Sequence, residues 1–368
     1  MTTSASDERF MRLALALGYR NLGRTWPNPS VGAVLVDPSD GRIVSAGVTQ
    51  PGGRPHAERV ALAEAGEAAR GKTLYVSLEP CSHHGRTPPC AEAVIASGVG
   101  RLVTSLEDAD RRVAGRGHAM ICEAGIALAT GILSAEAARD HRGHFTRARE
   151  GRPAVILKLA RTADGFAAAG TARLMITGEG ANRRTHMLRA HADAVLVGVS
   201  TILADDPGLD VRLPGMEARS PVRVVADSHL RTPLGSRLVE TAEDRKTFIL
   251  CGPEADRAAE ERLEARGVTV LRVPALDGGK LELRSALRRL GEVGLTRILC
   301  EGGPTLADAL ARDDLLDEAV VITNERPLGA RGLEAVGPHL SAALAAKFRT
   351  LSDEPVGPDR IRHLERAI

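Results

Sequence analysis

Apolar residues along the chain recur at two spacings, and segments of the two kinds alternate. Residues 7–22 (DERFMRLALALGYRNL) space their apolar positions three or four residues apart, which predicts an amphipathic helix. Residues 31–37 (VGAVLVD) and 42–48 (RIVSAGV) instead predict two strands around a turn at Asp40-Gly41. The elements expected in this half are helices at 7–22, 56–69 and 87–98 and strands at 31–37, 42–48, 73–79 and 101–107. Strands that alternate with helices predict a layered α/β sheet.

A polar helical segment at 134–150 separates this series from a second one. Gly151-Arg152-Pro153 ends the segment, because proline cannot continue a helix. The second series is expected as strands at 154–160, 193–199, 222–226, 247–250, 268–273 and 297–303 and helices at 179–191, 254–265 and 283–291. Each series has enough elements for its own core, so we expect two α/β domains, residues 1–149 and 150–368.

The composition is that of a globular chain and limits the class of partner. Of 368 residues, 43% are hydrophobic, but only five Phe, two Tyr and one Trp are present. The cores must therefore be aliphatic, and stacking platforms for nucleic-acid bases are scarce. The chain has 49 Lys and Arg against 47 Asp and Glu, a formal charge of +2 that is too balanced for capture of a polyanion or an anionic membrane. A small-molecule substrate is expected, with neither nucleic acid nor membrane as partner.

The sequence shows no targeting or membrane signal. No apolar run approaches the roughly 20 residues of a membrane helix, and the start MTTSASDERF lacks the basic and apolar regions of a signal peptide. We therefore expect a cytoplasmic protein. Its five cysteines are an odd and sparse set, which in a reducing compartment argues against a disulfide framework. A close pair of them is then a metal site or a coincidence.

His56, Cys81 and Cys90 form a pattern suited to catalytic zinc. His56-Ala57-Glu58 begins an expected helix, and PCSHHGRTPPC at 80–90 links the end of a strand to the next helix. One imidazole and two thiolates give zinc three protein ligands and leave a fourth position for water. Glu58 can take a proton from that water and hand it to a leaving amine. The two helix N-termini would further favour thiolates and hydroxide.

The spacing of the two cysteines departs from the general zinc-deaminase pattern, H-x-E with P-C-x-x-C. Eight residues rather than two separate Cys81 from Cys90, a distance that the turn-rich SHHGRTPP can close. His83 and His84 in this loop are rival ligands, or alternatively loop or substrate-facing residues. The pattern leaves these alternatives open.

Four segments of this half carry a family resemblance. NPSVGAVLV at 28–36, HAE at 56–58, EPCSHHGRTPPC at 79–90 and VAGRG at 113–117 resemble motifs in the deaminase half of the RibD family of bifunctional riboflavin-biosynthesis enzymes. The resemblance covers residues 7–150 and implies a cytidine-deaminase-like three-layer domain. It implies that His56, Cys81 and Cys90 bind zinc and that Glu58 shuttles protons. It also implies that Asn28 recognises the pyrimidine, for which the structural alternative is an Asx turn ahead of Pro29.

The second half contains no G-x-G-x-x-G, so it gives no indication of a Rossmann dinucleotide site. Its polar clusters are Lys158 with TADG at 162–165, MITGE at 175–179, STILADDPGLDVR at 200–212, DSHLRTPL at 227–234 and CEGGPTL at 300–306. EGGPTL offers glycine amides and a helix N-terminus to a phosphate, although Gly-Gly-Pro is also an ordinary strand-to-helix turn. Asp205-Asp206-Pro207 could likewise be only a helix stop.

In this order the clusters resemble the reductase half of the same family, over residues 154 to about 325. That resemblance implies a dihydrofolate-reductase-like α/β domain that uses NADPH. The cofactor contacts it implies are Arg161, Met175, Thr201, Asp205, Ser228 and Gly303 with its following helix. The substrate contacts it implies are Arg173, Arg189, Leu209, Arg212 and Glu301. Arg173 and Met175 stand where many members have Ser and Trp, and the loss of Trp removes a flat packing surface beside the nicotinamide.

Arg212, and less strongly Arg189, suit a bidentate grip on a 5′-phosphate. The alternative for Arg212 is a surface ion pair with Asp210 or Glu217.

Together these interpretations predict a two-step enzyme. The first step is hydrolytic deamination of 2,5-diamino-6-ribosylamino-4(3H)-pyrimidinone 5′-phosphate, a pyrimidine ribonucleotide, with Zn²⁺. The second is NADPH reduction of its ribosyl side chain to ribityl. The alternative is a zinc deaminase of another nucleotide or of a nucleic-acid base, joined to a non-catalytic second domain. The sequence leaves homo-oligomer formation open.

Overall fold

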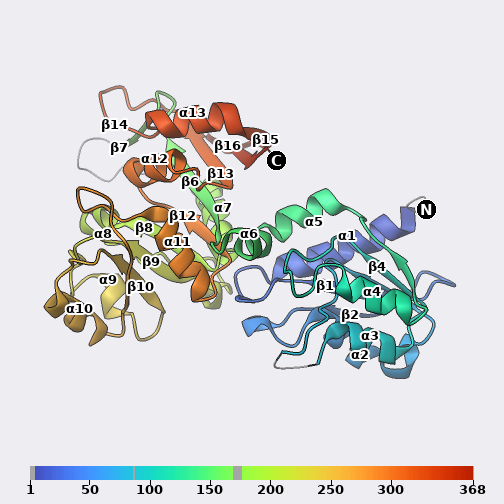
Figure 1. Ribbon diagram of the computed structural model, residues 1–368. Helices are drawn as coiled ribbons and strands as arrows, with labels where there is room; N and C mark the ends of the chain where they lie inside the picture. The colour runs from blue at the N-terminus through green and yellow to red at the C-terminus, as the bar shows by residue number, and fades with distance from the viewer. Residues whose placement is uncertain (1–4, 86–87, 169–175, 368) are drawn as a thin grey trace. The chain divides into compact units, whose positions relative to one another are not determined.

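The computed structural model describes residues 5–85, 88–168 and 176–367. The chain forms two compact units, Met1–Gly151 and Arg152–Ile368 (Figure 1). Each unit has its own sheet and its own buried cores, so each is described by itself.

The first unit is built on a five-stranded sheet with the strand order β2-β1-β3-β4-β5. β1 (Gly32–Val36) is antiparallel to β2 (Ile43–Val48) and to β3 (Thr73–Val76). β4 (Arg101–Thr104) and β5 (Ala127–Ala129) continue parallel to β3. Side chains alternate across a strand, and successive residues of β1 accordingly enter two different cores. The sheet is therefore buried on both faces.

Helices cover both faces of this sheet and make three layers (Figure 1). On one face, α1 (Ala5–Arg20) and α5 (Ser134–Asp140) contribute Met11 and Ala137 to a core that also holds Tyr75. On the other, α2 (Ala57–Ala65), α3 (Cys90–Ser97) and α4 (Arg116–Glu123) contribute Ala61, Val94 and Ile121. The layered α/β prediction for this half is confirmed.

The single helix predicted over 134–150 is wrong. The segment forms α5 and a separate α6 (Arg142–Glu150), with His141 between them in a non-helical conformation, φ −90° and ψ 5°. The His141 ring is 2% exposed and its Nε2 lies 3.3 Å from Ser77 Oγ, just beyond β3. Helical periodicity does not show that one ring in the segment is anchored to the sheet.

The second unit contains a nine-stranded sheet with the order β11-β10-β9-β8-β12-β6-β13-β16-β15. The first seven strands in this order are parallel to their neighbours. Their bounds are β6 Ala154–Arg161, β8 Ala194–Gly198, β9 Val222–Ala226, β10 Thr247–Cys251, β11 Thr269–Arg272, β12 Arg297–Cys300 and β13 Glu318–Asn324. A largely parallel sheet must be covered on both faces, and its strands are accordingly almost fully buried.

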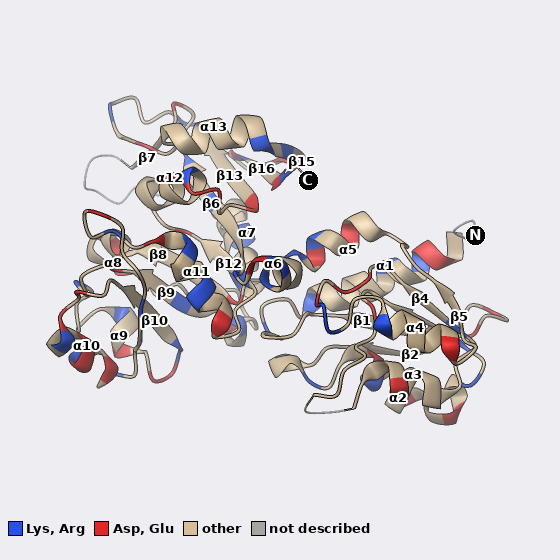
Figure 2. Cartoon of the chain, in the orientation of Figure 1, with Lys and Arg blue, Asp and Glu red and all other residues tan. Residues whose placement is uncertain are grey.

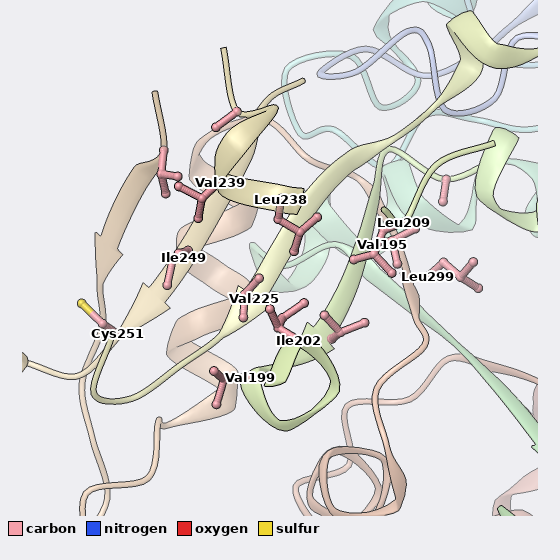
Figure 3. Close-up of a cluster of buried hydrophobic side chains, with 14 of the residues drawn as sticks. Val195, Val199, Ile202, Leu209, Val225, Leu238, Val239, Ile249, Cys251 and Leu299 are labelled. Carbon is pink, nitrogen blue, oxygen red and sulfur yellow. The ribbon is translucent and has the colours of Figure 1, made fainter. Parts of the chain in front are cut away.

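The helices of this unit are α7 (Glu179–Ala190), α8 (Val199–Asp205), α9 (Arg237–Glu240), α10 (Arg257–Glu264), α11 (Leu283–Glu292), α12 (Pro304–Arg312) and α13 (Pro338–Lys347). One large aliphatic core joins helices and strands, and Figure 3 shows part of it, from Val195 of β8 to Ile202 of α8, Leu238 of α9 and Ile249 of β10. As expected from the composition, no aromatic side chain belongs to this cluster.

The end of the chain, to which no element was assigned from the sequence, completes the sheet. β15 (Phe348–Val356) and β16 (Asp359–Arg366) form an antiparallel hairpin, and β16 pairs with β13. β15 is the edge strand and is exposed along nearly its whole length. A separate small sheet pairs β7 (Phe166–Ala168) with β14 (Leu333–Glu334). Exposed edge strands lack the apolar alternation that a sequence prediction needs.

Acidic and basic side chains are interspersed along the ribbon of both units (Figure 2). Among the described residues, no helix has the length and apolar character needed to cross a membrane.

Candidate active sites

In the first unit, His56, Cys81 and Cys90 lie together although 34 residues of sequence separate the first from the last. Their ligand atoms all lie within 4.8 Å of one another. His56 Nδ1 is 3.7 Å from Cys81 Sγ and 3.4 Å from Cys90 Sγ. This is one imidazole nitrogen and two thiol sulfurs converging on one point, a donor set that zinc prefers.

Local structure explains why the three ligands meet. His56 is the N-cap of α2, and Cys90 is the first residue of α3. The backbone N–H of Cys90 donates to Cys81 Sγ at 3.2 Å, and the N–H of Ala91 donates to the Cys81 carbonyl at 3.1 Å. The long loop between the cysteines is thus closed by the N-terminus of α3. Hydrogen bonds from Cys90 and then from His56 lower the pKa of Cys81 to about 4, so a thiolate is favoured there.

Glu58 lies in the first turn of α2, 3% exposed, beside the same cluster. Burial raises the pKa of its carboxyl group, and His56, Cys81 and Cys90 are the charged or polar groups that act on it. A carboxyl group whose pKa is raised toward neutrality is suited to accept and release a proton. The structure therefore brings the predicted proton shuttle to the predicted ligands.

The rival ligands His83 and His84 do not belong to the cluster of His56, Cys81 and Cys90 ligand atoms found among the described residues. His84 is exposed, and its Nε2 faces Glu92 Oε1 at 3.5 Å. His83 is half-buried in the loop. Neither imidazole joins the sulfurs of Cys81 and Cys90.

Asn28 is hydrogen-bonded to the segment that precedes His56. Its carboxamide donates from Nδ2 to the carbonyl of Gly53 at 2.8 Å. Gly53 has φ +83°, and a Cβ there would lie 2.5 Å from Asn28 Nδ2, so only glycine allows this approach. The bond across to Gly53 differs from the Asx turn considered as its structural alternative.

Glu79 has a structural role that no motif in the sequence predicts. Its carboxylate is 3% exposed and accepts backbone N–H groups from Asp108, Gly115 and His118 at 3.0, 3.0 and 3.1 Å. Gly115 has φ +77°, and a Cβ on Gly117 would lie 2.1 Å from the Pro80 carbonyl. These contacts explain both glycines of VAGRG, which packs against the residues just before Cys81. Ligand atoms of Glu79, Glu107 and His118 lie within 4.8 Å of one another, as a metal site would require. We interpret this cluster as structural, because the Glu79 carboxylate already accepts three backbone N–H groups.

In the second unit, the residues with implied cofactor roles follow neighbouring parallel strands. Ser228 follows β9, Thr201 and Asp205 lie on α8 after β8, Gly303 follows β12, and Arg161 ends β6. Because these strands are parallel, their carboxyl ends lie at the same edge of the sheet. Open α/β sheets bind ligands at that edge, at the point where the strand order reverses. Arg173 and Met175 lie outside the described residues.

Gly303 is the N-cap of α12, a nine-residue helix with proline at its start. A Cβ on Gly303 would meet no atom within 4 Å, so its backbone faces open space. Unpaired amides at a helix N-terminus favour anions. By contrast, Arg161 donates from Nε to Thr323 Oγ1 at 3.0 Å and lines an open cavity of about 510 Å³ at the ends of β6 and β13.

The residues with implied substrate roles have two different environments. Arg189 and Glu301 form a buried ion pair, with Nε–Oε1 and Nη2–Oε2 distances of 2.6 and 2.8 Å. Arg212 is exposed and its Nη1 lies 2.7 Å from Asp210 Oδ1, the surface pair considered as an alternative. Leu209 has φ +50° and is 3% exposed, with its side chain in the core.

Lys158, noted in the sequence without a role, is half-buried in the middle of β6. Burial lowers the pKa of its ammonium group, and the nearest charges acting on it are Glu301, Arg189 and Asp359. Lys158 therefore lies within electrostatic reach of both members of the Arg189–Glu301 pair.

Comparison with known proteins identifies both units. A cytidine and deoxycytidylate deaminase zinc-binding region matches residues 4–106, and a RibD C-terminal domain matches residues 153–360. The riboflavin biosynthesis protein RibD of Escherichia coli (strain K12) is 40% identical over 97% of this chain and 99% of its own length. RibD of Mycobacterium tuberculosis (strain ATCC 25618 / H37Rv) is 36% identical, over 98% and 97%.

Solved structures of similar proteins match this chain over both units. Acinetobacter baumannii RibD, form 1, has a TM-score of 0.86 at 32% identity and covers 99% of each chain. A Thermotoga maritima diaminohydroxyphosphoribosylaminopyrimidine deaminase / 5-amino-6-(5-phosphoribosylamino)uracil reductase has a TM-score of 0.84 at 32% identity, over 98% of this chain and 99% of that one.

The fold and the two sites define a zinc-dependent deaminase joined to a dihydrofolate-reductase-like reductase. Both enzymatic domains are present in one chain. The chain belongs to the RibD family of bifunctional deaminase-reductases of riboflavin biosynthesis. The predicted fold class, the enzyme class and the cofactors of the family, zinc and NADPH, are confirmed, and the interpretation with a non-catalytic second domain is not supported.

Proposed function

We propose that this chain deaminates 2,5-diamino-6-ribosylamino-4(3H)-pyrimidinone 5′-phosphate in residues 1–149 and then reduces the ribosyl group of the product to ribityl in residues 150–368. The convergence of His56 Nδ1, Cys81 Sγ and Cys90 Sγ beside buried Glu58 is the observation that carries the proposal. The activity for which the similar Thermotoga maritima enzyme is named supports the substrate class.

In the deaminase unit, His56, Cys81 and Cys90 would hold zinc. The donor set fits that metal. Among the described residues His56 Nε2 is buried without a hydrogen-bond partner, while Nδ1 faces the sulfurs. When bound, zinc supplies the Lewis acidity that makes water a nucleophile at neutral pH.

Glu58 then performs the proton transfers. Its carboxylate accepts a proton from the attacking water as the water oxygen bonds to the amino-bearing carbon of the pyrimidine. It delivers that proton to the departing amine, which leaves as ammonia when the C–N bond breaks. Asn28 would bind the pyrimidine ring through its carboxamide oxygen, since its Nδ2 is already bonded to the Gly53 carbonyl near His56.

In the reductase unit, NADPH would lie along the carboxyl ends of β9, β8, β12 and β6. Gly303 and the N-terminus of α12 would face a phosphate, and Thr201, Asp205 and Ser228 flank that edge. When bound, NADPH supplies the hydride. Glu301 and Leu209 would contact the sugar, and Arg212 would bind the 5′-phosphate with a side chain that is 58% exposed.

Removal of zinc separates the two steps. After chelation we expect loss of ammonia release from the diamino substrate, while the deaminated substrate still causes loss of NADPH absorbance. Readdition of zinc should restore ammonia release. Absence of NADPH oxidation with the deaminated substrate would refute the reductase assignment. The partner class is then a small molecule, and a cytoplasmic location fits a biosynthetic enzyme of this kind.

A further inference from the structure

Arg272, the last residue of β11, binds the backbone of the loop that follows β10. Its Nη1 donates to the carbonyls of Gly252 and Pro253 at 3.3 and 2.7 Å, and its Nη2 donates to the Ala255 carbonyl at 2.9 Å. The Arg272 side chain is 18% exposed. One guanidinium therefore gathers three carbonyl groups of the loop formed by residues 252–255.

Glu260 of α10 binds the same guanidinium. Arg272 Nε donates to Glu260 Oε2 at 3.1 Å, and Nη2 donates to the same oxygen. The hydrogen bonds from Arg272 lower the pKa of Glu260, so the carboxyl group is ionised at neutral pH. The five N–H groups of a guanidinium are thus matched by five hydrogen bonds inside the protein. Arg272 therefore fixes loop 252–255 to α10 and has no donor left for a ligand.

Loop 252–255 in turn contacts the segment that carries Ser228. The backbone N–H of Gly252 donates to the Ser228 carbonyl at 3.0 Å. A Cβ on Gly252 would lie 3.3 Å from that carbonyl oxygen, closer than side chains normally pack. The loops after β9 and β10 are therefore joined by a close backbone contact, and Arg272 acts on Ser228 through Gly252.

The proposed cofactor site gives these two loops a place along NADPH. A phosphate is proposed at Gly303, which follows β12, and the two nucleosides of NADPH lie on opposite sides of its pyrophosphate. The reduced sugar is proposed at Glu301, within electrostatic reach of Lys158 on β6, so the nicotinamide half belongs on the β6 side. The adenosine half then extends the other way along the sheet edge. β9 and β10 are the second and third strands from β12 on that side, about 10 and 14 Å away at the usual strand spacing.

We infer that Arg272 is a positioning residue of the NADPH site, which holds loop 252–255 against Ser228 and so orders the surface that binds the adenosine half of the cofactor. The inference rests on the proposed function of the second unit. Arg272 acts only through the loop, because its own N–H groups are all directed at protein acceptors.

The consequence is a change in cofactor affinity and not in the chemical step. Without Arg272, the carbonyls of loop 252–255 lose their shared donor and the loop gains conformational freedom. Binding of the cofactor must then order the loop, which lowers affinity. The hydride is delivered at the other half of NADPH, which the loop does not contact in the proposed site. The rate at saturating NADPH should therefore be retained.

The test compares Arg272→Ala, Arg272→Lys and Gly252→Ala in the full-length chain. Each variant is assayed for kcat and for KM of NADPH with deaminated substrate. Calorimetry gives the dissociation constant of adenosine 2′,5′-bisphosphate, the adenosine part of NADPH without the nicotinamide. We expect Arg272→Ala to raise KM for NADPH and this dissociation constant about tenfold, with kcat at saturating NADPH within about twofold of normal. Arg272→Lys should recover part of the affinity, because an ammonium replaces some of the guanidinium donors. Gly252→Ala, which crowds the Ser228 carbonyl and leaves Arg272 in place, should raise the same two constants.

Arg257→Ala is the matched control. Arg257 donates to the same Glu260 oxygen at 3.1 Å, but its side chain is 75% exposed, and among the described residues it makes no hydrogen bond to loop 252–255. Its substitution should leave KM for NADPH and the dissociation constant of the bisphosphate unchanged.

Unchanged constants in Arg272→Ala would show that the inference is wrong. The same holds if Arg272→Ala lowers kcat while KM for NADPH stays the same, because Arg272 would then act on the fold of the unit and not on the cofactor site. If Arg272→Ala does not fold, Arg272→Lys and Gly252→Ala decide by the same measurements. An unaltered chain that neither binds the bisphosphate nor oxidises NADPH would instead refute the proposed cofactor site, which distinguishes that failure from this one.

Discussion

The backbone N–H of Cys90 donates a hydrogen bond to the sulfur of Cys81 at 3.2 Å. The N-terminus of α3 thereby holds one candidate ligand while its first residue supplies another. An amide that points at a sulfur favours the thiolate form, which is the form that binds metal. The pair is therefore prepared for zinc by the start of one helix.

From this arrangement we expect Cys81→Ser to lose most of its zinc. A serine hydroxyl is a poor substitute for a thiolate, and the two remaining ligands leave the metal weakly held. Metal analysis of the purified variant should give well under one equivalent. Cys122→Ser is the matched control, because Cys122 is exposed on α4 and should retain full zinc. A full equivalent in Cys81→Ser would reject Cys81 as a ligand.

Glu58→Gln should keep zinc and fold but lose deamination. The amide fills the same buried space on α2 but cannot carry a proton, so ammonia release should fall about 10² to 10⁴-fold. Reduction of the deaminated substrate should be unaffected. Glu64→Gln, an exposed change on the same helix, should leave both rates near normal. Near-normal deamination by Glu58→Gln would assign the proton transfers to another group.

Sequence patterns indicate the candidate zinc site because two of its three residues, His56 and Cys90, stand at helix N-termini with strong local signals. The H-A-E at the start of α2 and the proline before Cys90 each mark a helix N-terminus. Glu79 could not be found in this way, since its three partners are backbone amides that no side-chain motif records. A signal was nevertheless present in the two glycines of VAGRG. The backbone N–H of Gly115 donates to the Glu79 carboxylate, and a Cβ on Gly117 would lie 2.1 Å from the Pro80 carbonyl.

In the reductase unit, by contrast, local sequence patterns did not predict which residues contact one another. Arg189 and Glu301 are 112 residues apart, and a resemblance gives each a ligand role without showing that they bind one another. Pairing depends on which strands become neighbours, here β8 beside β12, and long-range order of that kind is not encoded in local periodicity. The exposed edge strand β15 was missed because it has no apolar alternation to detect.

Glu79→Ala should destabilise the first unit. The substitution leaves three amides, those of Asp108, Gly115 and His118, without their acceptor. Unsatisfied buried groups cost about 1–3 kcal/mol each, so a loss of roughly 3 kcal/mol or more is expected. Denaturant-induced unfolding, followed by a spectroscopic signal from the first unit, measures this loss in the free energy of unfolding. Glu123→Ala, exposed on α4, should change stability by no more than about 0.5 kcal/mol. Equal stability of the two variants would show that Glu79 is not a structural anchor.

The two activities should separate when the chain is divided between the units. Each unit has its own sheet and its own cores, so a fragment ending at Gly151 has the elements of a complete domain. We expect residues 1–151 to be folded by circular dichroism, to hold zinc and to release ammonia. Residues 152–368 should oxidise NADPH with deaminated substrate. A first fragment that is soluble only in the presence of the second would mean that the units depend on a shared core.

Arg212→Ala tests the phosphate grip. The Arg212 guanidinium is 58% exposed and bonds only Asp210 among the described residues, an exposed ion pair that contributes at most about 1 kcal/mol to stability. The substitution should therefore leave folding intact. A grip used equally in the ground and transition states raises KM without lowering kcat, so KM for the phosphorylated substrate should rise about tenfold or more. KM for NADPH should not change. Arg183→Ala, exposed on α7 and paired with Glu179, is the control and should alter neither constant. A rise confined to NADPH would place Arg212 in the cofactor site, and unchanged constants would leave it as the surface ion pair with Asp210.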